Sequence, residues 1–395
     1  MDDTESTGGS APPPRYPKVR ISSPADVLAV VPHLLGFHPA NSLVVIGAGR
    51  PRDRIELTFR YDLPDPPDAD QATDIAAHSL AVLGRRSLSI VIGIGYGPGR
   101  LVTPVADVLA AGLRQAGLRP RELMRVEGGR YWSYICRNPA CCPAEGVPFD
   151  VGAHPAAAAM VLAGMAAHPD RATLARTLAP VSGSVADSMN RATRRAGQRA
   201  GGLIAEPAGP WPADRTRRLV AAGRRAVIEA IQTYRGGGQV SEDDTIAWLS
   251  VVLAQLPVRD DAWARMDPEH QEAHLRLWAD IVRRACSRYV PAPASLLAFT
   301  AWQAGDGALA NIAIDRALAA DPAYSMALLL RDIMDAGVPP SEARMPMTPD
   351  QVAASYALTD ADSAPGRPLA PESGRDAGSG RDAGSGRRAR RRPSR

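Results

Sequence analysis

The run Leu88–Ile94 constrains the fold of this chain more than any other feature. Its residues are almost continuously apolar, which is typical of a strand buried on both faces. Helical patterns flank it, at about Gln71–Leu83 on one side and Thr103–Ala116 on the other. A buried strand between two helices indicates an α/β domain.

The segments before this run predict a helix and a hairpin. Ser23 is a typical N-cap residue and Gly36 a typical terminator, so a first helix is expected between them. Two strand-like runs follow, Ser42–Ile46 and Ile55–Tyr61, joined by a short link rich in turn residues. Their closeness favours an antiparallel pair.

Strand patterns end near residue 150. Two further strands are predicted, Glu122–Val126 and Tyr131–Ile135, which completes the order α-β-β-α-β-α-β-β for a mixed-sheet α/β domain over residues 20–150. An α-helical domain over residues 151–340 is expected to follow. Its helices are predicted at 155–167, 171–178, 184–200, 214–234, 242–256, 268–289, 293–304, 307–320 and 322–336.

Both ends of the chain are expected to be disordered, as an arm over residues 1–19 and a basic tail over residues 341–395, because they lack apolar periodicity. The tail ends in six arginines: Arg387, Arg388, Arg390, Arg391, Arg392 and Arg395. We expect these to make weak, non-specific contacts with nucleic acid or an acidic partner. The whole chain has a net charge of +4 and these six arginines contribute +6, so the rest of the chain has a net charge of −2. That remainder does not resemble a surface that coats nucleic acid.

The basic residues exclude several enzyme classes. Lys18 is the only lysine and lies in the N-terminal arm. The folded part therefore has no Schiff-base lysine and no phosphate-loop lysine, which excludes pyridoxal enzymes and Walker-type ATPases. No apolar run approaches the roughly 20 residues that cross a bilayer, and the N-terminus lacks signal-peptide character. We expect a cytoplasmic protein without membrane contact.

Three stretches together resemble an actinobacterial family defined by a domain of unknown function, family 4192. They are LLGFHPANSLVV at 34–45, the run from VEGGRYWSYIC to CCP at 126–143 with Gly146, and AWQAGD at 301–306. The resemblance covers roughly residues 20–337. It implies no particular activity, cofactor or partner.

Residues 297–322 are similar to a single tetratricopeptide repeat. The matching positions are Leu297, Ala298, Gly305, Asp306, Ala310, Ile314, Ala317 and Pro322. Small alanines allow two antiparallel helices to approach closely. Ala294 and Ala301 depart from the pattern, because bulky aromatic residues usually stand there. One repeat cannot bury its own apolar face, so this pair is expected to pack on the preceding helices.

The candidate functional loop contains Cys136, Cys141 and Cys142 within seven residues. Side chains of adjacent cysteines are expected to diverge, and zinc would need a fourth ligand such as His154 or Cys286. Structural thiols or an opportunistic disulfide are therefore favoured over metal binding and over redox or nucleophilic use. We predict neither a metal site nor a cofactor.

A second candidate is a ligand-binding turn formed by Gly93, Gly95, Gly97 and Gly99. The turn follows a strand and precedes a helix, which is the context in which backbone N–H groups bind phosphate. Pro98 replaces the third glycine of the dinucleotide-binding pattern and has no N–H group. A tight connecting turn is the favoured interpretation.

Three histidines are candidate functional residues. His270 and His274 are four apart on a predicted helix, but the catalytic glutamate of the HExxH motif is replaced by Gln271, so a solvated helix surface is favoured. His38 precedes a strand as Gly-Phe-His-Pro and is included in the candidate site, although a packing role is the more common one.

The sequence favours a non-catalytic binding or scaffold protein whose C-terminal helices present a surface to a partner protein. The alternative is an enzyme or nucleotide-binding protein that uses the Cys136–Cys142 loop or the Gly93–Gly99 turn. A nucleic-acid-associated factor acting through the arginine tail is a third option. If Cys136, His38 and the glycine turn lie in one pocket of the fold, the enzyme hypothesis is favoured.

Overall fold

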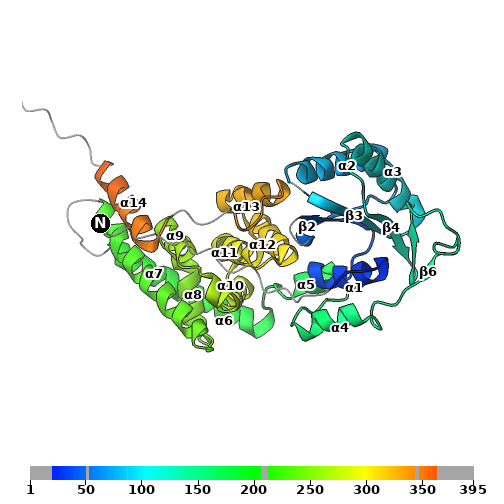
Figure 1. The fold of residues 1–395 in the computed structure, drawn as a ribbon. Coiled ribbons are helices and arrows are strands. Elements are labelled where there is room, and N and C mark those ends of the chain that lie inside the picture. The colour runs from blue at the N-terminus through cyan, green and yellow to red at the C-terminus, as the bar shows by residue number, and fades with distance from the viewer. Residues whose placement is uncertain (1–19, 50–52, 87, 206–211, 343–346, 363–395) are drawn as a thin grey trace, which may run out of the picture.

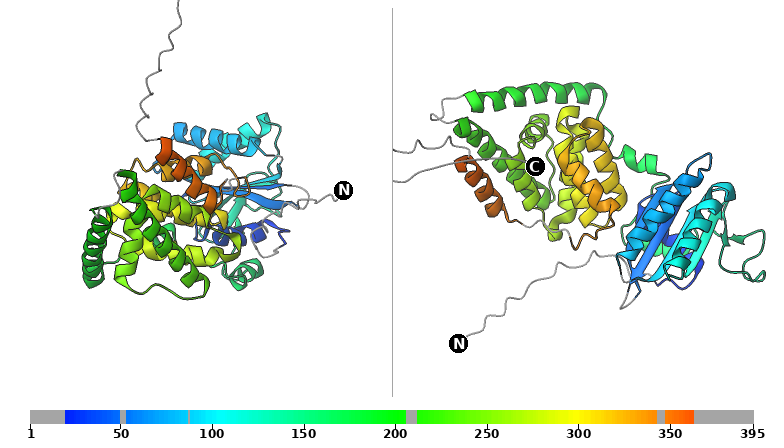
Figure 2. Two further views of the ribbon diagram at one scale, coloured as in Figure 1. Left: turned by 90° about the vertical axis from the view of Figure 1, so that its left-hand side faces the viewer. Right: turned by 90° about the horizontal axis from the view of Figure 1, so that it is seen from above.

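A computed structural model of the chain describes residues 20–49, 53–86, 88–205, 212–342 and 347–362. A sheet half, formed by the described residues of 24–162, lies beside a helical half, formed by those of 183–362, and the short helix Arg171–Arg176 lies between them (Figures 1 and 2). The expectations for the 1–19 arm and for the arginines of the tail lie outside the described residues.

The sheet half contains one mixed sheet with the strand order β2-β1-β3-β4-β5-β6. The strands are β1 (Ser42–Gly49), β2 (Arg54–Asp62), β3 (Leu88–Tyr96), β4 (Glu122–Glu127), β5 (Arg130–Ser133) and β6 (Val147–Pro148). β3 and β4 are parallel, and the other neighbours are antiparallel. The predicted mixed-sheet order is confirmed, and β6 adds a strand of two residues, too short to show a periodic pattern.

Helices cover both faces of this sheet (Figure 1). Helices α2 (Ala69–Gly84) and α3 (Gly99–Gln115) pack on one face, where Leu43, Val45 and Val91 are buried against them. Helix α1 (Pro24–Leu35) lies on the other face and packs against α4 (Pro155–Leu162). Helix α4, which begins after residue 150, thus packs with the sheet half, and the domain boundary near residue 150 stays a prediction.

Helix α1 begins and ends where its capping residues predict. The Asp26 N–H donates to Ser23 Oγ at 3.2 Å, and the Asp26 carboxylate accepts the Ser23 N–H at 2.8 Å. This reciprocal pair satisfies two N–H groups that the first helical turn leaves without partners. Gly36 ends the helix with φ 72°, a left-handed conformation that favours glycine.

Beyond residue 162 the described chain consists of helices joined by loops, and its one β-type pairing is an isolated bridge between Phe37 and His168. The helices are α5 (Arg171–Arg176), α6 (Gly183–Ala205), α7 (Pro212–Arg235), α8 (Asp243–Val252), α9 (Leu256–Ala264), η1 (Pro268–His270), α10 (Gln271–Arg284), η2 (Ser287–Tyr289), α11 (Pro291–Gln303), α12 (Gly307–Ala320), α13 (Ser325–Asp335) and α14 (Pro349–Asp362). The single helix predicted over 268–289 is wrong, because the chain breaks it into η1, α10 and η2. None of the described helices has the length and apolarity needed to cross a membrane.

Helix α14 corrects the expectation that residues 341–395 are disordered throughout. Val352 is 2% exposed, and the Tyr356 hydroxyl donates to the Asp260 carboxylate on α9. An apolar contact and a hydrogen bond thus hold this helix against α9. The prediction of disorder is wrong for residues 349–362.

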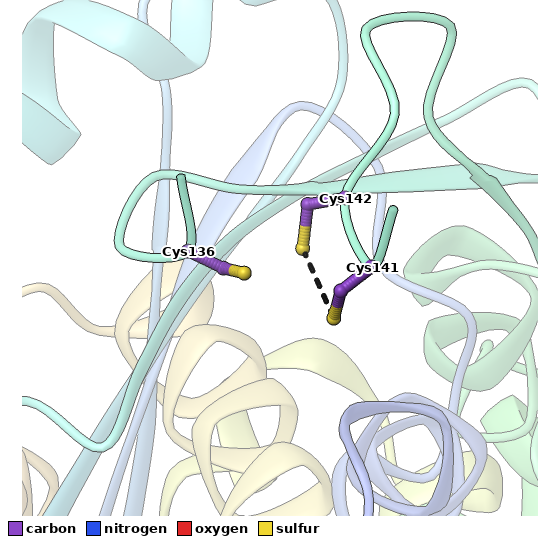
Figure 3. Close-up of side chains that lie close together, drawn as sticks. All are labelled: Cys136, Cys141 and Cys142. Atoms are coloured by element: carbon purple, nitrogen blue, oxygen red, sulfur yellow. Dashed lines mark hydrogen bonds between the residues drawn. The ribbon is translucent and has the colours of Figure 1, made fainter. Parts of the chain in front are cut away.

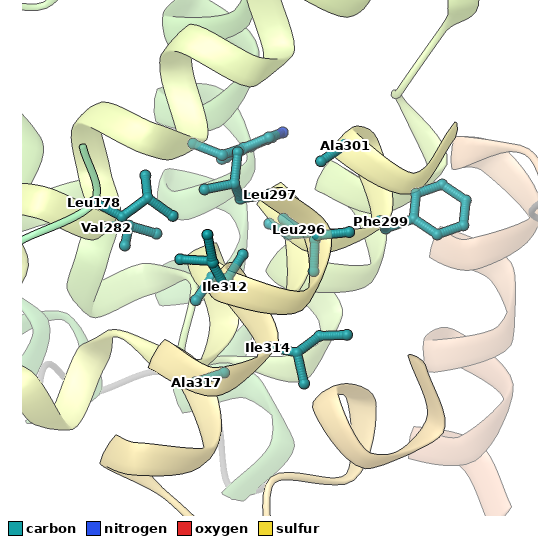
Figure 4. Packing of buried hydrophobic residues seen from close by; sticks show 14 of the residues in the cluster. Leu178, Val282, Leu296, Leu297, Phe299, Ala301, Ile312, Ile314 and Ala317 are labelled. Carbon is teal, nitrogen blue, oxygen red and sulfur yellow. The ribbon is translucent and has the colours of Figure 1, made fainter. Parts of the chain in front are cut away.

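One hydrophobic core runs through both halves. It connects Val44 and Ile94 of the sheet to Leu178 and then to the centre of the helical half. Nearly every residue of α11 is buried, and Leu296 and Leu297 pack near Ile312 and Ile314 of α12 (Figure 4). The predicted helix pair therefore packs on its neighbours, while its likeness to a tetratricopeptide repeat stays a prediction.

Polar contacts also join the halves. Side chains near the end of α2 donate to backbone carbonyls at the end of α13, in the pairs His78–Asp335, Arg85–Ala336 and Arg86–Gly337 at 2.7–2.8 Å. Carbonyls at a helix C-terminus have no partners within the helix, so cationic donors are favourable there. These bonds fix α13 against the sheet half.

Candidate functional site

The candidate site lies in the loop that joins β5 to β6 at the end of the molecule far from the helical half (Figure 1). This loop contains Cys136, Cys141 and Cys142, and all three are free thiols. Their sulfur atoms lie within 4.8 Å of one another, and those of Cys141 and Cys142 are 3.8 Å apart. The side chains point toward one shared space (Figure 3).

A backbone turn at Asn138 brings the adjacent cysteines together. The Asn138 carbonyl accepts the N–H groups of Cys141 at 3.1 Å and Cys142 at 2.7 Å, which is one turn of helix-like chain. Successive side chains are about 100° apart on such a turn, rather than on opposite sides as in a strand. The expectation that the two cysteine side chains diverge is therefore wrong.

Side chains of β5 hold the loop in place. Ser133 Oγ accepts the N–H groups of Ile135 and Cys136, and this turn starts the loop. At the other end of the loop, Trp132 Nε1 donates to the Ala144 carbonyl at 3.0 Å and Arg130 donates to the Gly146 carbonyl at 2.8 Å. The thiols are thus carried by a loop with polar anchors at both ends.

The surroundings of the thiols differ in a way that separates their pKa values. The backbone amide of Asn138 lowers the pKa of Cys136, because it donates a hydrogen bond that favours the thiolate, and the Cys142 thiol adds to this effect. Burial raises the pKa of Cys142 to about 12, and its hydrogen bonds to the other two thiols act in the same direction. The pKa values of Cys136 and Cys142 are therefore shifted in opposite directions.

The two residues considered as a fourth ligand do not belong to the cluster. His154 caps α4, where its Nδ1 accepts the Ala156 N–H at 3.2 Å. Cys286 lies in the helical half and contacts Asn190 Oδ1 at 3.1 Å. Among the described residues, the thiol cluster consists of three ligands.

The glycine turn has a packing explanation. A Cβ at Gly93 would approach Leu123 to 2.6 Å, and one at Gly95 would approach Val102 to 2.0 Å. These two glycines therefore let β4 and α3 pack closely on β3. Gly97 has φ 131°, its N–H donates to the Val126 carbonyl at 2.9 Å, and Gly99 begins α3.

The structure does not bring the three candidate features together. β5 runs antiparallel to β4, which is parallel to β3. The chain thus leaves β5 at the opposite end of the strands from the point where β3 ends at Gly97. His38 lies near that other end, exposed, and its backbone N–H donates to the His168 carbonyl at 2.9 Å. Partial desolvation by the surrounding chain lowers the His38 pKa, and the charge of His33 acts in the same direction.

The histidine pair also differs from expectation. His274 is 1% exposed and stacks on Trp278, so its assignment to a solvated helix surface is wrong. Burial lowers its pKa to about 4, and the charge of Arg235 acts in the same direction. His270 Nδ1 lies 2.9 Å from the Asp267 carboxylate.

Sequence reasoning missed Ser133 and Asn138, whose hydrogen bonds shape the thiol loop. The Asn-Pro dipeptide at 138–139 was an available turn signal. No comparable signal shows that the resulting turn would bring the sulfur atoms together.

The chain matches the model of one protein family, described as a domain of unknown function (DUF4192), over residues 24–341. Because this match covers most of the chain, the protein belongs to that family. No curated protein and no solved structure matches the chain.

Proposed function

We propose that the protein is a non-catalytic binding protein that holds a soft metal ion, Zn²⁺ in the first place, on Cys136, Cys141 and Cys142. The observation that carries this proposal is the convergence of three sulfur atoms within 4.8 Å. The cytoplasmic location expected from the sequence would keep these thiols reduced.

The spacing of the sulfurs fits a metal–thiolate site. A zinc–sulfur bond of about 2.3 Å in tetrahedral geometry separates two sulfur ligands by roughly 3.8 Å. The sulfurs of Cys141 and Cys142 are already 3.8 Å apart. The third sulfur lies within 4.8 Å of both, so a small movement of Cys136 completes a triangular set of donors.

The chemistry of the donors selects the class of metal. Thiolates are soft ligands that favour Zn²⁺ and Cu(I) over Mg²⁺ and Ca²⁺. The Asn138 amide favours the thiolate of Cys136, which is the form that binds metal. Three protein ligands leave one position of a tetrahedral zinc site for water or another small ligand.

The arrangement supports binding rather than catalysis. The thiols lie beyond the end of β5, while His38 and the glycine turn lie at the opposite end of the strands. An enzyme that used all three features would need them within contact of one substrate.

Metal content of the full-length protein tests the proposal. The reduced protein, loaded with Zn²⁺ and freed of excess metal, should retain about one ion per chain. Loading with Co²⁺ should give thiolate-to-cobalt charge-transfer absorption. Cys136→Ser, Cys141→Ser and Cys142→Ser should each weaken retention strongly, because each removes one of three thiolate ligands.

Cys286→Ser is the matched control, because Cys286 is the one cysteine of the chain outside the cluster. This variant should retain zinc as the unaltered protein does. Retention that is absent in the unaltered protein, or lost equally in all four variants, contradicts the proposal.

A second candidate is partner binding by the helical half, as the sequence favours. Helix α11 is too buried to offer a surface, but Leu328 and Leu329 on α13 are 41% and 49% exposed. The double variant Leu328→Ser/Leu329→Ser should reduce cross-linking of the protein to a partner in cells without changing its helical circular dichroism. Unchanged cross-linking speaks against this surface.

A further inference from the structure

We infer that the cysteine loop is a redox-controlled metal site, in which a peroxide links Cys136 to Cys141 or Cys142 as a disulfide and thereby releases the metal ion. This inference rests on the metal site proposed above. It adds a chemical modification, its oxidant and its consequence to that site.

The geometry restricts which cysteines can pair. Consecutive Cα atoms are about 3.8 Å apart, whereas disulfides usually join Cα atoms about 4.4–6.8 Å apart. A disulfide between Cys141 and Cys142 is therefore strained. Cys136 approaches from the other arm of the loop, with its sulfur within 4.8 Å of both (Figure 3). Rotation about the side-chain torsion angles brings the Cys136 sulfur to the S–S bond distance of about 2.05 Å from its partner.

The first step takes place at Cys136. Its sulfur lies within 4.8 Å of both other sulfurs, so either neighbouring cysteine can pair with it, and the thiolate is the form that attacks peroxide. Its sulfur attacks one peroxide oxygen, the O–O bond breaks, and the leaving oxygen departs as water after taking up a proton. Cys136 is then a sulfenic acid, with the attacked peroxide oxygen bonded to its sulfur.

The second step forms the disulfide. The sulfur of Cys141 or Cys142 attacks the Cys136 sulfur, the S–O bond breaks, and the oxygen leaves as a second water molecule. Two thiols have then lost two electrons and one peroxide has gained them. Cys141 is exposed and Cys142 half-buried, so solvent reaches the cluster from the side of Cys141.

The disulfide removes two of the three ligands. A disulfide sulfur is not a thiolate, and the thiolate is the metal ligand. One remaining thiolate on an exposed loop cannot retain the ion against a chelator. Reduction of the disulfide should restore both ligands and metal binding.

The experiment uses the full-length Cys286→Ser variant, which contains only the three cluster cysteines. Zinc-loaded protein is titrated with hydrogen peroxide in the presence of a chromogenic chelator. We expect about one zinc ion released per peroxide consumed, and rebinding after a dithiol reductant. Peptide mapping should show Cys136 linked to Cys141 or Cys142.

The outcomes separate this inference from the proposed function. A protein that cannot be loaded with zinc refutes the proposed function, and the metal-free protein still reports whether the predicted disulfide forms. Zinc that loads but stays bound after one equivalent of peroxide refutes the redox inference alone. A Cys141–Cys142 disulfide, or oxidation of Cys136 without any disulfide, also refutes it.

Discussion

Substitution of Gly146 by alanine tests whether the packing of the loop sets its affinity for metal. Gly146 has φ 82°, and its carbonyl accepts a hydrogen bond from Arg130. A Cβ built at this position would lie 2.5 Å from Cε2 and 2.9 Å from Nε1 of Trp132. Alanine therefore strains the backbone and pushes against the ring that anchors Ala144.

Two energy costs follow from this geometry. A left-handed conformation costs a non-glycine residue about 1–2 kcal/mol. Overpacking against a ring that cannot easily move adds about 1–3 kcal/mol. When about 2 kcal/mol of this cost is borne by the metal-bound form of the loop, the free energy of zinc binding is weaker by that amount and the zinc dissociation constant rises roughly 30-fold.

Gly128→Ala provides the matched control. Gly128 lies in the turn between β4 and β5 with φ 57°, and a Cβ there meets no atom within 4 Å. This variant should lose about 1–2 kcal/mol of stability without weakening zinc binding. Competition with a chromophoric chelator measures affinity, and urea unfolding measures stability. Equal zinc affinity in Gly146→Ala and Gly128→Ala would refute the reasoning.

Three further predictions follow from the structure. Zinc affinity should fall at least about tenfold per pH unit below neutrality, because Cys142 must lose its proton to bind the metal and burial raises its pKa to about 12. Calorimetry in buffers of different ionisation enthalpy should detect the released protons. A zinc affinity that does not change with pH argues against thiolate ligation. Hydrogen bonds from Ser22 and Ser23 lower the pKa of Asp26 from 3.8 to about 2, so its stabilising effect is full above pH 4 and disappears as the pH falls through 2. The urea midpoint of Asp26→Asn should therefore fall less over this pH range than that of the unaltered protein. Equal falls in both proteins are the contrary result. Leu178→Ala should cost about 2–5 kcal/mol, because Leu178 is 2% exposed in the core that joins the halves; a loss below about 1 kcal/mol in urea unfolding contradicts the shared core.

Local patterns predicted most of the sheet half because they act within a few residues. The apolar run Leu88–Ile94 forms most of β3, and α1 begins after Ser23 and ends at Gly36, as the capping chemistry of these residues requires. The features that sequence did not predict depend on distant contacts. Two-residue β6 exists because it pairs with β5, and α14 exists because Val352 and Tyr356 contact other helices.

The residues of the candidate site and the proximity of Cys136 to Cys141 were predictable, but the approach of the adjacent Cys141 and Cys142 sulfurs was not. Three cysteines within seven residues were visible as a candidate loop, yet their convergence depends on one carbonyl at Asn138 that accepts two N–H groups. His274 illustrates the opposite error, since a polar residue on an amphipathic helix was assigned to solvent and lies buried against Trp278. Helical spacing shows which residues share a face but not what covers that face.

Packing accounts for two of the three stretches through which the chain resembles its family. Phe37 is 3% exposed in the core, and the backbone of His38 pairs with His168. Asp306 caps α12 by accepting the Leu309 N–H at 2.9 Å. The cysteines of the remaining stretch have no such role. They lie on a partly exposed loop at the edge of the sheet. At such a position a thiol contributes little more to core packing than alanine or serine would. A loop that fixes three sulfurs within 4.8 Å is therefore better explained by what the sulfurs bind than by what they stabilise.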